Sequence, residues 1–176
     1  PGQITSSAQS STGSQRGQTN FCGDDDVWVF SESTDIIDLT GDSLVCSGSS
    51  GTSSQAYGRS HDLSNLDTGG NDISLQCVTW GMKQAVEDLT ATVNVYSDDD
   101  GNPASGLAFI GSIDGTISAN DQPFYQTFEF DGLVVPAGIL FIELIVDEST
   151  SQNSHSIAAN DAGQSSPSWI RTLDGS

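Results

Sequence analysis

Positive charge is what this sequence has least of. Lys and Arg together number 4 in 176 residues, against 24 Asp and Glu, so the formal net charge is −20. Proteins that bind nucleic acids or anionic membrane surfaces do so with clustered cations, which this chain does not have. We therefore expect no nucleic acid and no anionic membrane surface as a partner.

Long apolar runs and helix-favouring composition are also missing. The most apolar stretch, 140–146, is interrupted by Glu143 and is far too short to cross a bilayer, so we expect no membrane insertion. Only 16% of the residues are charged, and the abundant Ser, Thr, Gly, Asn and Asp favour turns and short strands. An all-helical fold is excluded.

Residues for catalysis or zinc binding are scarce. Three Cys without a Cys-x-x-Cys spacing and only two His lack the ligands of a structural zinc site. There is no Gly-x-Ser-x-Gly elbow, and His155 falls in a polar segment where we expect it to be solvated. Glu129 and Glu143 are the best candidates for a glycosidase pair, but we expect both on polar, solvated strand faces. We predict that the protein is not an enzyme.

The acidic residues indicate the environment of the protein. Most are Asp beside Gly, Asn or Ser, where short carboxylates cap turns or bind hard cations. Salt or divalent cations must screen this charge, which favours an extracellular location and calcium as a possible cofactor. We expect calcium in turns at Asp24, Asp25 and Asp26 and at Asp98, Asp100 and Asn102. The second site is no EF-hand, because Pro103 and Phe109 replace its required Gly and Glu.

The three cysteines allow one disulfide. Cys46 and Cys77 are the preferred pair, because both lie in or next to predicted strands. Cys22 is then free, exchanges into that pair, or bridges two chains, and the sequence does not decide among these. The chain opens at Pro1 without an initiator Met, as expected after removal of a secretion leader. We therefore expect a secreted protein, outside the cell or on its surface.

Residues 1–20 are expected to form an extended polar arm. Fifteen of them are Ser, Thr, Gln or Gly, and only Ile4 and Ala8 are apolar, so the arm has no core of its own. Such a segment becomes ordered when its main chain pairs with a sheet edge. We assign Ile4, Ser6, Ala8 and Ser10 as its docking residues. The alternative is that residues 1–20 are a linker between domains.

Strand and turn signals alternate from residue 24 onward. The pattern is clearest at 89–96, where apolar and polar residues alternate and indicate a half-buried strand. The expected strands are 27–30, 35–39, 43–46, 56–63, 73–82, 89–96, 107–113, 124–130, 139–146, 154–159 and 168–172. This pattern predicts an all-β fold over 21–176, a two-sheet antiparallel sandwich resembling a jelly roll.

Several motifs resemble a type of secreted bacterial jelly-roll β-sandwich module, similar to carbohydrate-binding modules and found in exported surface proteins. They are Ser43–Cys46, Tyr57–Leu63, Val78–Gly81, Val93–Tyr96, Val135–Gly138, Asn160–Gln164 and Ser166–Ile170, and the resemblance covers 33–173. It implies a non-catalytic module. It also implies one more apolar strand after the Trp-Ile segment, which we expect to be missing because the chain stops at Ser176.

Two functions follow as expectations. The first is a non-catalytic extracellular structural subunit that docks its arm on a neighbouring copy, by strand donation, and so forms a filament or a surface layer. The second is a carbohydrate-binding or adhesion module of a larger secreted protein, with an extracellular polysaccharide as its partner. Its aromatic platform would be Trp28, Tyr57 and Trp169.

Overall fold

The computed structural model describes residues 39, 43–44, 54–64, 71–149, 151, 154–158 and 168–173. These residues form strands joined by turns, and none of them lies in a helix that could span a membrane. The strands are β1 (Ser43–Leu44), β2 (Gln55–Asp62), β3 (Ile73–Ala85), β4 (Leu89–Asp98), β5 (Leu107–Ile117), β6 (Phe124–Val135), β7 (Ile139–Val146), β8 (His155–Ala158) and β9 (Ser168–Thr172).

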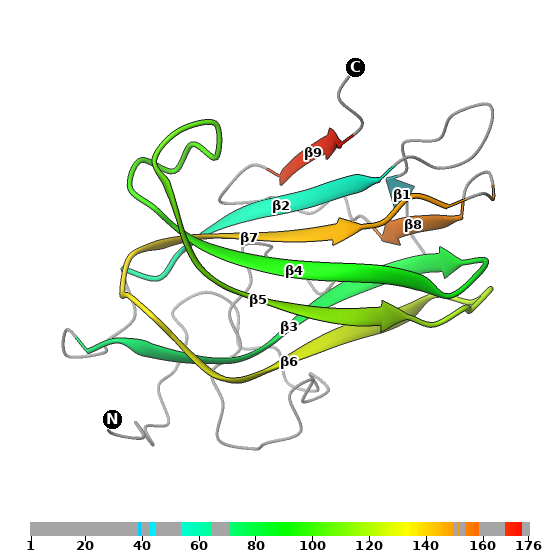
Figure 1. Ribbon diagram of the computed structural model, residues 1–176, viewed down its shortest axis with the longest axis horizontal. Coiled ribbons are helices and arrows are strands. Elements are labelled where there is room, and N and C mark those ends of the chain that lie inside the picture. Colours follow the sequence, from blue (N-terminus) through cyan, green and yellow to red (C-terminus); the bar gives the residue numbers. More distant parts are fainter. Residues whose placement is uncertain are drawn as a thin grey trace.

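The strands form two antiparallel sheets packed as a sandwich (Figure 1), with the orders β1-β8-β3-β6 and β5-β4-β7-β2-β9. β1 pairs with β8, β2 with β7, β3 with β6 and β4 with β5. This nested pairing of eight strands is a jelly roll. β9 is a ninth strand: β2 pairs with β7 along one edge and with β9 along the other.

The core lies between β4, β5 and β7 of one sheet and β3 and β6 of the other. Alternation in β4 buries Leu89, Ala91, Val93 and Val95, as the sequence predicted. Gly111 and Gly115 of β5 leave room for side chains from β6, because an added Cβ would lie 2.8 Å from Leu133 and 2.9 Å from Phe128. Small residues on one sheet thus receive large residues from the other.

The predicted two-sheet sandwich is confirmed, and β7 and β9 have the predicted bounds. β3, β5 and β6 continue beyond the predicted ends. In β6 the continuation passes through Gly132, whose φ of 66° suits glycine. The predicted strand 27–30, most of 35–39 and the arm 1–20 lie outside the described residues.

Candidate functional site

The outermost strand of the five-stranded sheet, β9, exposes neighbouring apolar side chains. It pairs only with β2 there, with Trp169 opposite Gly58 and Ile170 opposite Tyr57. Trp169 is 40% exposed, Ile170 43% and Leu173, just after the strand, 37%. Consecutive strand residues point to opposite faces, so β9 exposes apolar side chains on both faces. Figure 1 shows β9, in red, at the margin of its sheet beside β2.

A side-chain link across β2 holds β9 to the sheet. Arg171 of β9 donates to Oε1 of Glu143 on β7, from Nε at 3.0 Å and from Nη2 at 2.8 Å. The β2 residue opposite Arg171 is Ala56, whose side chain is small. The Glu143 side chain is 4% exposed and that of Arg171 61%. A carboxylate buried this deeply needs a cationic partner, and Arg171 supplies it.

The two glutamates considered for catalysis are not brought together. Glu129 is exposed on β6, between the buried Phe128 and Phe130, so it lies on the outer face of the four-stranded sheet. Glu143 lies on the outer face of the other sheet. The expectation that Glu143 is solvated was wrong, because it is 3% exposed and paired with Arg171.

Aromatic rings form a row on the same outer face of the five-stranded sheet. The Tyr96 ring lies 5.7 Å from that of Phe109, at 70° to it, and 6.2 Å from that of Phe141, at 40°. These rings share no plane and so form no flat surface on which a sugar ring would stack. Burial, and next the charge of Glu143, raises the pKa of Tyr96.

The three predicted sugar-binding rings lie in different environments. Trp169 is exposed on β9, as a platform residue would be. Tyr57 is 5% exposed and faces the interior, where its hydroxyl donates to Gln55 Oε1 and lies 3.2 Å from His155 Nε2. A ring in that position presents no face to a ligand outside. Trp28 lies outside the described residues.

A buried polar chain links the two sheets beside Tyr57. His155, on β8, is fully buried, and its Nδ1 lies 3.1 Å from Oγ of Ser154, which is also fully buried. Burial lowers the pKa of His155 to about 4, so the imidazole is neutral near pH 7. The expectation of a solvated His155 was therefore wrong. Because neither Ser154 nor His155 has exposed surface, this Ser–His contact fits a structural role.

The predicted calcium ligands at the β4–β5 turn hold the turn itself. Asp98 Oδ1 accepts the amide N–H of Gly101 at 2.8 Å, and Asp98 Oδ2 accepts the Ser60 hydroxyl at 3.2 Å. Asp100 accepts the Ser105 hydroxyl at 2.9 Å and the Asn102 amide at 3.0 Å. Those two bonds lower the pKa of Asp100. Successive Asx turns of this kind account for the Asp98, Asp100 and Asn102 spacing.

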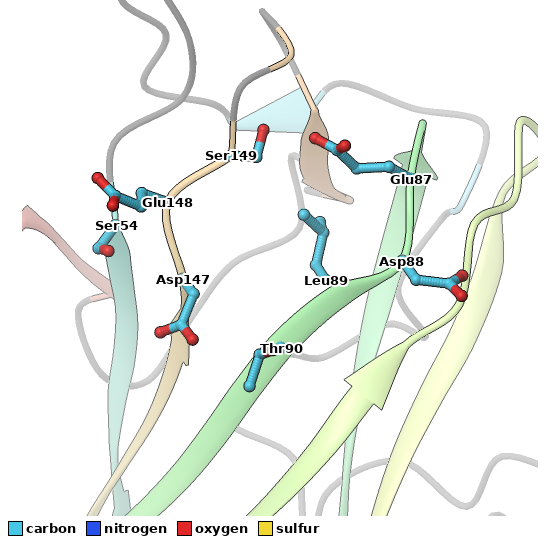
Figure 2. A pocket seen from close by; sticks show the side chains of 8 residues that line it. All are labelled: Ser54, Glu87, Asp88, Leu89, Thr90, Asp147, Glu148 and Ser149. Carbon is cyan, nitrogen blue, oxygen red and sulfur yellow. The ribbon is translucent and has the colours of Figure 1, made fainter.

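A hollow at one end of the sandwich is lined by eight residues, four of them acidic (Figure 2): Ser54, Glu87, Asp88, Leu89, Thr90, Asp147, Glu148 and Ser149. Figure 2 shows Asp88 and Glu148 pointing in opposite directions. Asp88 instead accepts the amide of Ala119 at 2.8 Å. Nowhere in the described part of the chain do three or more His, Cys, Asp or Glu gather closely enough to hold a metal ion.

The remaining predicted residues are only partly placed. Cys77 is half-buried on β3, opposite Glu129 of β6, whereas Cys22 and Cys46 lie outside the described residues. The Cys46–Cys77 pairing therefore stays a prediction. The acidic triplet Asp24–Asp26 and the docking residues of the arm also lie outside.

Two features of this site could not be predicted from the sequence. The Glu143–Arg171 pair joins strands that are far apart in the chain, and only the sheet order makes them near neighbours. The 43% exposure of Ile170 likewise depends on β9 being an edge strand.

Comparisons of this chain with protein-family models, with curated proteins and with solved structures find no match.

Proposed function

We propose that the protein is a non-catalytic extracellular structural subunit that assembles with copies of itself into a filament or surface layer. In this proposal, the leading segment of one copy docks as an added strand on an open sheet edge of the next. The resemblance to exported bacterial modules and the strong acidity support the extracellular location and a role for calcium in screening charge. Repetition of a head-to-tail contact produces a filament when the rotation does not close.

The observation that carries the proposal is the exposed apolar edge formed by β9. Natural proteins blunt their sheet edges with charges, bulges or covering segments, because an open edge templates the addition of another strand. Among the described edges, β6 exposes Glu129 and Asp131 as well as Val134, and β5 exposes Asp114 as well as Phe109. β9 instead exposes Trp169 and Ile170 and has no acidic residue. Its one charged residue is Arg171, so β9 lacks the acidic residues that charge the β5 and β6 edges.

The charge of the leading segment, residues 1–20, favours its approach to this edge. Residues 1–20 contain Arg16 and no Asp or Glu, whereas all 24 acidic residues lie in 21–176. Two sandwich bodies therefore repel each other, while the leading segment of one approaches the other without like-charge repulsion. Main-chain hydrogen bonds supply the affinity of such a contact, so the segment needs few large apolar side chains.

Deletion of residues 1–20 tests the proposal. The full chain should form polymers in negative-stain images and by light scattering, in a physiological salt buffer with calcium. The deleted chain should stay monomeric while keeping the β-sheet circular dichroism spectrum. A chain in which the order of residues 1–20 is scrambled keeps length and composition and serves as the matched control. Polymers from the deleted chain, or a full chain that stays monomeric, would contradict the proposal.

Carbohydrate binding is the second candidate, and the exposed Trp169 beside Arg171 is the observation that favours it. An exposed indole next to a guanidinium offers a stacking surface and hydrogen-bond donors to a polysaccharide. Affinity electrophoresis in gels containing soluble polysaccharides tests this function. Retardation of the monomer that is lost in Trp169→Ala, but kept in Phe109→Ala, would support it.

A further inference from the structure

We infer that the acceptor edge is β9 and that residues around Ile4 to Ala8 of a second copy add to it, with Ile4 and Ala8 on the inner face beside Ile170. This inference rests on the proposed function, and it names the two surfaces that meet. Three properties of the described edge lead to it: the direction of its backbone groups, its regularity and the side on which its apolar residues lie.

The ladder between β2 and β9 shows which backbone groups face outward. The N–H of Leu173 donates to the carbonyl of Ser54 at 2.9 Å. In an antiparallel ladder, hydrogen-bonded pairs alternate with non-bonded pairs. Arg171 and Trp169 therefore direct their N–H and C=O groups to β2. Ile170 and Thr172 direct theirs to the opposite side, where an added strand would bind them.

The regularity of the edge distinguishes β9 from its competitors. The five residue pairs between β2 and β9 follow one another without a register shift. The β4–β5 ladder shifts register between Val95 and Tyr96, and the β3–β6 ladder shifts between Leu75 and Cys77. Bulges bend a strand and interrupt pairing along an edge. β9 is thus the longest described edge strand whose ladder has no register shift.

The side-chain pattern of β9 indicates which face of an added strand must be apolar. Ile170 lies opposite Tyr57, whose side chain is in the interior, so Ile170 points to the inner side of the sheet and is still 43% exposed. A strand beside β9 covers Ile170 only if it places apolar side chains on that inner side. Ile4 and Ala8 are four residues apart and therefore share one face of an extended strand. They are the apolar residues that residues 1–20 offer for this purpose.

Paired substitutions in the full chain test whether Ile4 lies on the inner face of the sheet. Ile4→Asp places a charge on the inner side, whereas Thr5→Asp adds the same charge one residue away on the outer side. We expect Ile4→Asp to raise the concentration needed for polymers by about tenfold or more, because a charge replaces a buried apolar group. Thr5→Asp should change it by much less. Equal effects of the two substitutions would overturn the assigned face.

Hydrogen exchange tests the edge. Amide exchange of the full chain is compared below and above the concentration at which polymers form, by mass spectrometry on fragments covering 168–173. We expect slower exchange there, since Ile170 and Thr172 become hydrogen-bonded, and no change in fragments covering 107–117. Protection of 107–117 or of 124–135 instead would overturn the choice of β9. If deletion of residues 1–20 abolishes polymers but β9 stays unprotected, this inference fails while the proposed assembly stands.

Discussion

At the scale of single residues, Gly58 decides how the outer face of β2 is filled. The ring of Phe141 lies across this position, so that an added Cβ would be 2.1 Å from its Cζ. Phe141 is 4% exposed and packs against Tyr96, so its ring has little room to move. Glycine is required here for close approach and not for backbone conformation, since its φ is not in the left-handed region.

Gly58→Ala should therefore destabilise the protein by about 1–3 kcal/mol, through overpacking against the Phe141 ring. Urea unfolding followed by tryptophan fluorescence measures the change. Gly138→Ala is the matched control, because an added Cβ there meets nothing within 4 Å. We expect the control to be neutral or slightly stabilising. Equal destabilisation by both substitutions would show that close approach to Phe141 is not the cause.

His155 gives the stability of the protein a pH dependence of known sign. Its folded pKa is lowered to about 4 by burial, against an ordinary value of 6.5. As the pH falls from about 6.5 to about 4, the unfolded chain binds a proton that the folded chain does not, so stability decreases. The loss approaches about 3 kcal/mol for this group, at roughly 1.4 kcal/mol per unit of pKa difference.

The pH dependence of His61 has the same sign, because burial and then the charge of Arg59 lower its pKa to about 4. Urea unfolding at a series of pH values, with NMR titration of the two imidazoles, checks both groups. Neither imidazole should titrate near pH 6.5 in the folded protein. A folded-state midpoint near 6.5 for His155 would mean that the polar chain with Tyr57 and Ser154 is open to water.

At the scale of elements, the attachment of β9 to its sheet depends on a side-chain contact with β7, a strand with which β9 does not pair. β9 has five residues and is exposed throughout, so its ladder with β2 is weakly protected from solvent. The link from Arg171 to Glu143 adds a second attachment, to β7. The small side chain of Ala56, opposite Arg171 on β2, is compatible with that attachment.

Arg171→Gln should destabilise the protein by about 1–2 kcal/mol, a value reduced for the exposure of Arg171 to solvent. The loss arises because the buried Glu143 carboxylate is left without its cation. The double substitution with Glu143→Gln should cost less than the sum of the single ones. Urea unfolding and amide exchange at 168–173 measure these effects, and Thr172→Ala is the control on the same strand. Additive losses would mean that the pair does not couple β9 to β7.

At the scale of the whole molecule, a closed jelly roll carries a net charge of −20. The resemblance implied a missing final strand, whereas β1 to β8 complete the roll within the described residues, where β9 pairs with β2. In the described residues no three His, Cys, Asp or Glu gather closely enough to hold a metal ion, so the effect of this charge is argued for the molecule as a whole.

Self-repulsion of this charge should make stability rise with salt. We expect the urea midpoint to increase from low to high NaCl as the charges are screened. Calcium chloride at matched ionic strength separates screening from binding. A further increase that saturates at low calcium concentration would support a specific site, such as the one that the sequence predicts at Asp24–Asp26. A stability that does not change with NaCl would contradict the role assigned to self-repulsion.

The sequence by itself determined the all-β class and most strand positions, because the alternation of apolar and polar residues is a local signal. It is clear in residues such as Leu89, Ala91, Val93 and Val95. Only the tertiary structure decided that Tyr57 and His155 meet inside, that Arg171 reaches Glu143, and that Ile170 stays exposed. These facts depend on which strands become neighbours and which lie at an edge, and a chain read residue by residue does not contain the sheet order.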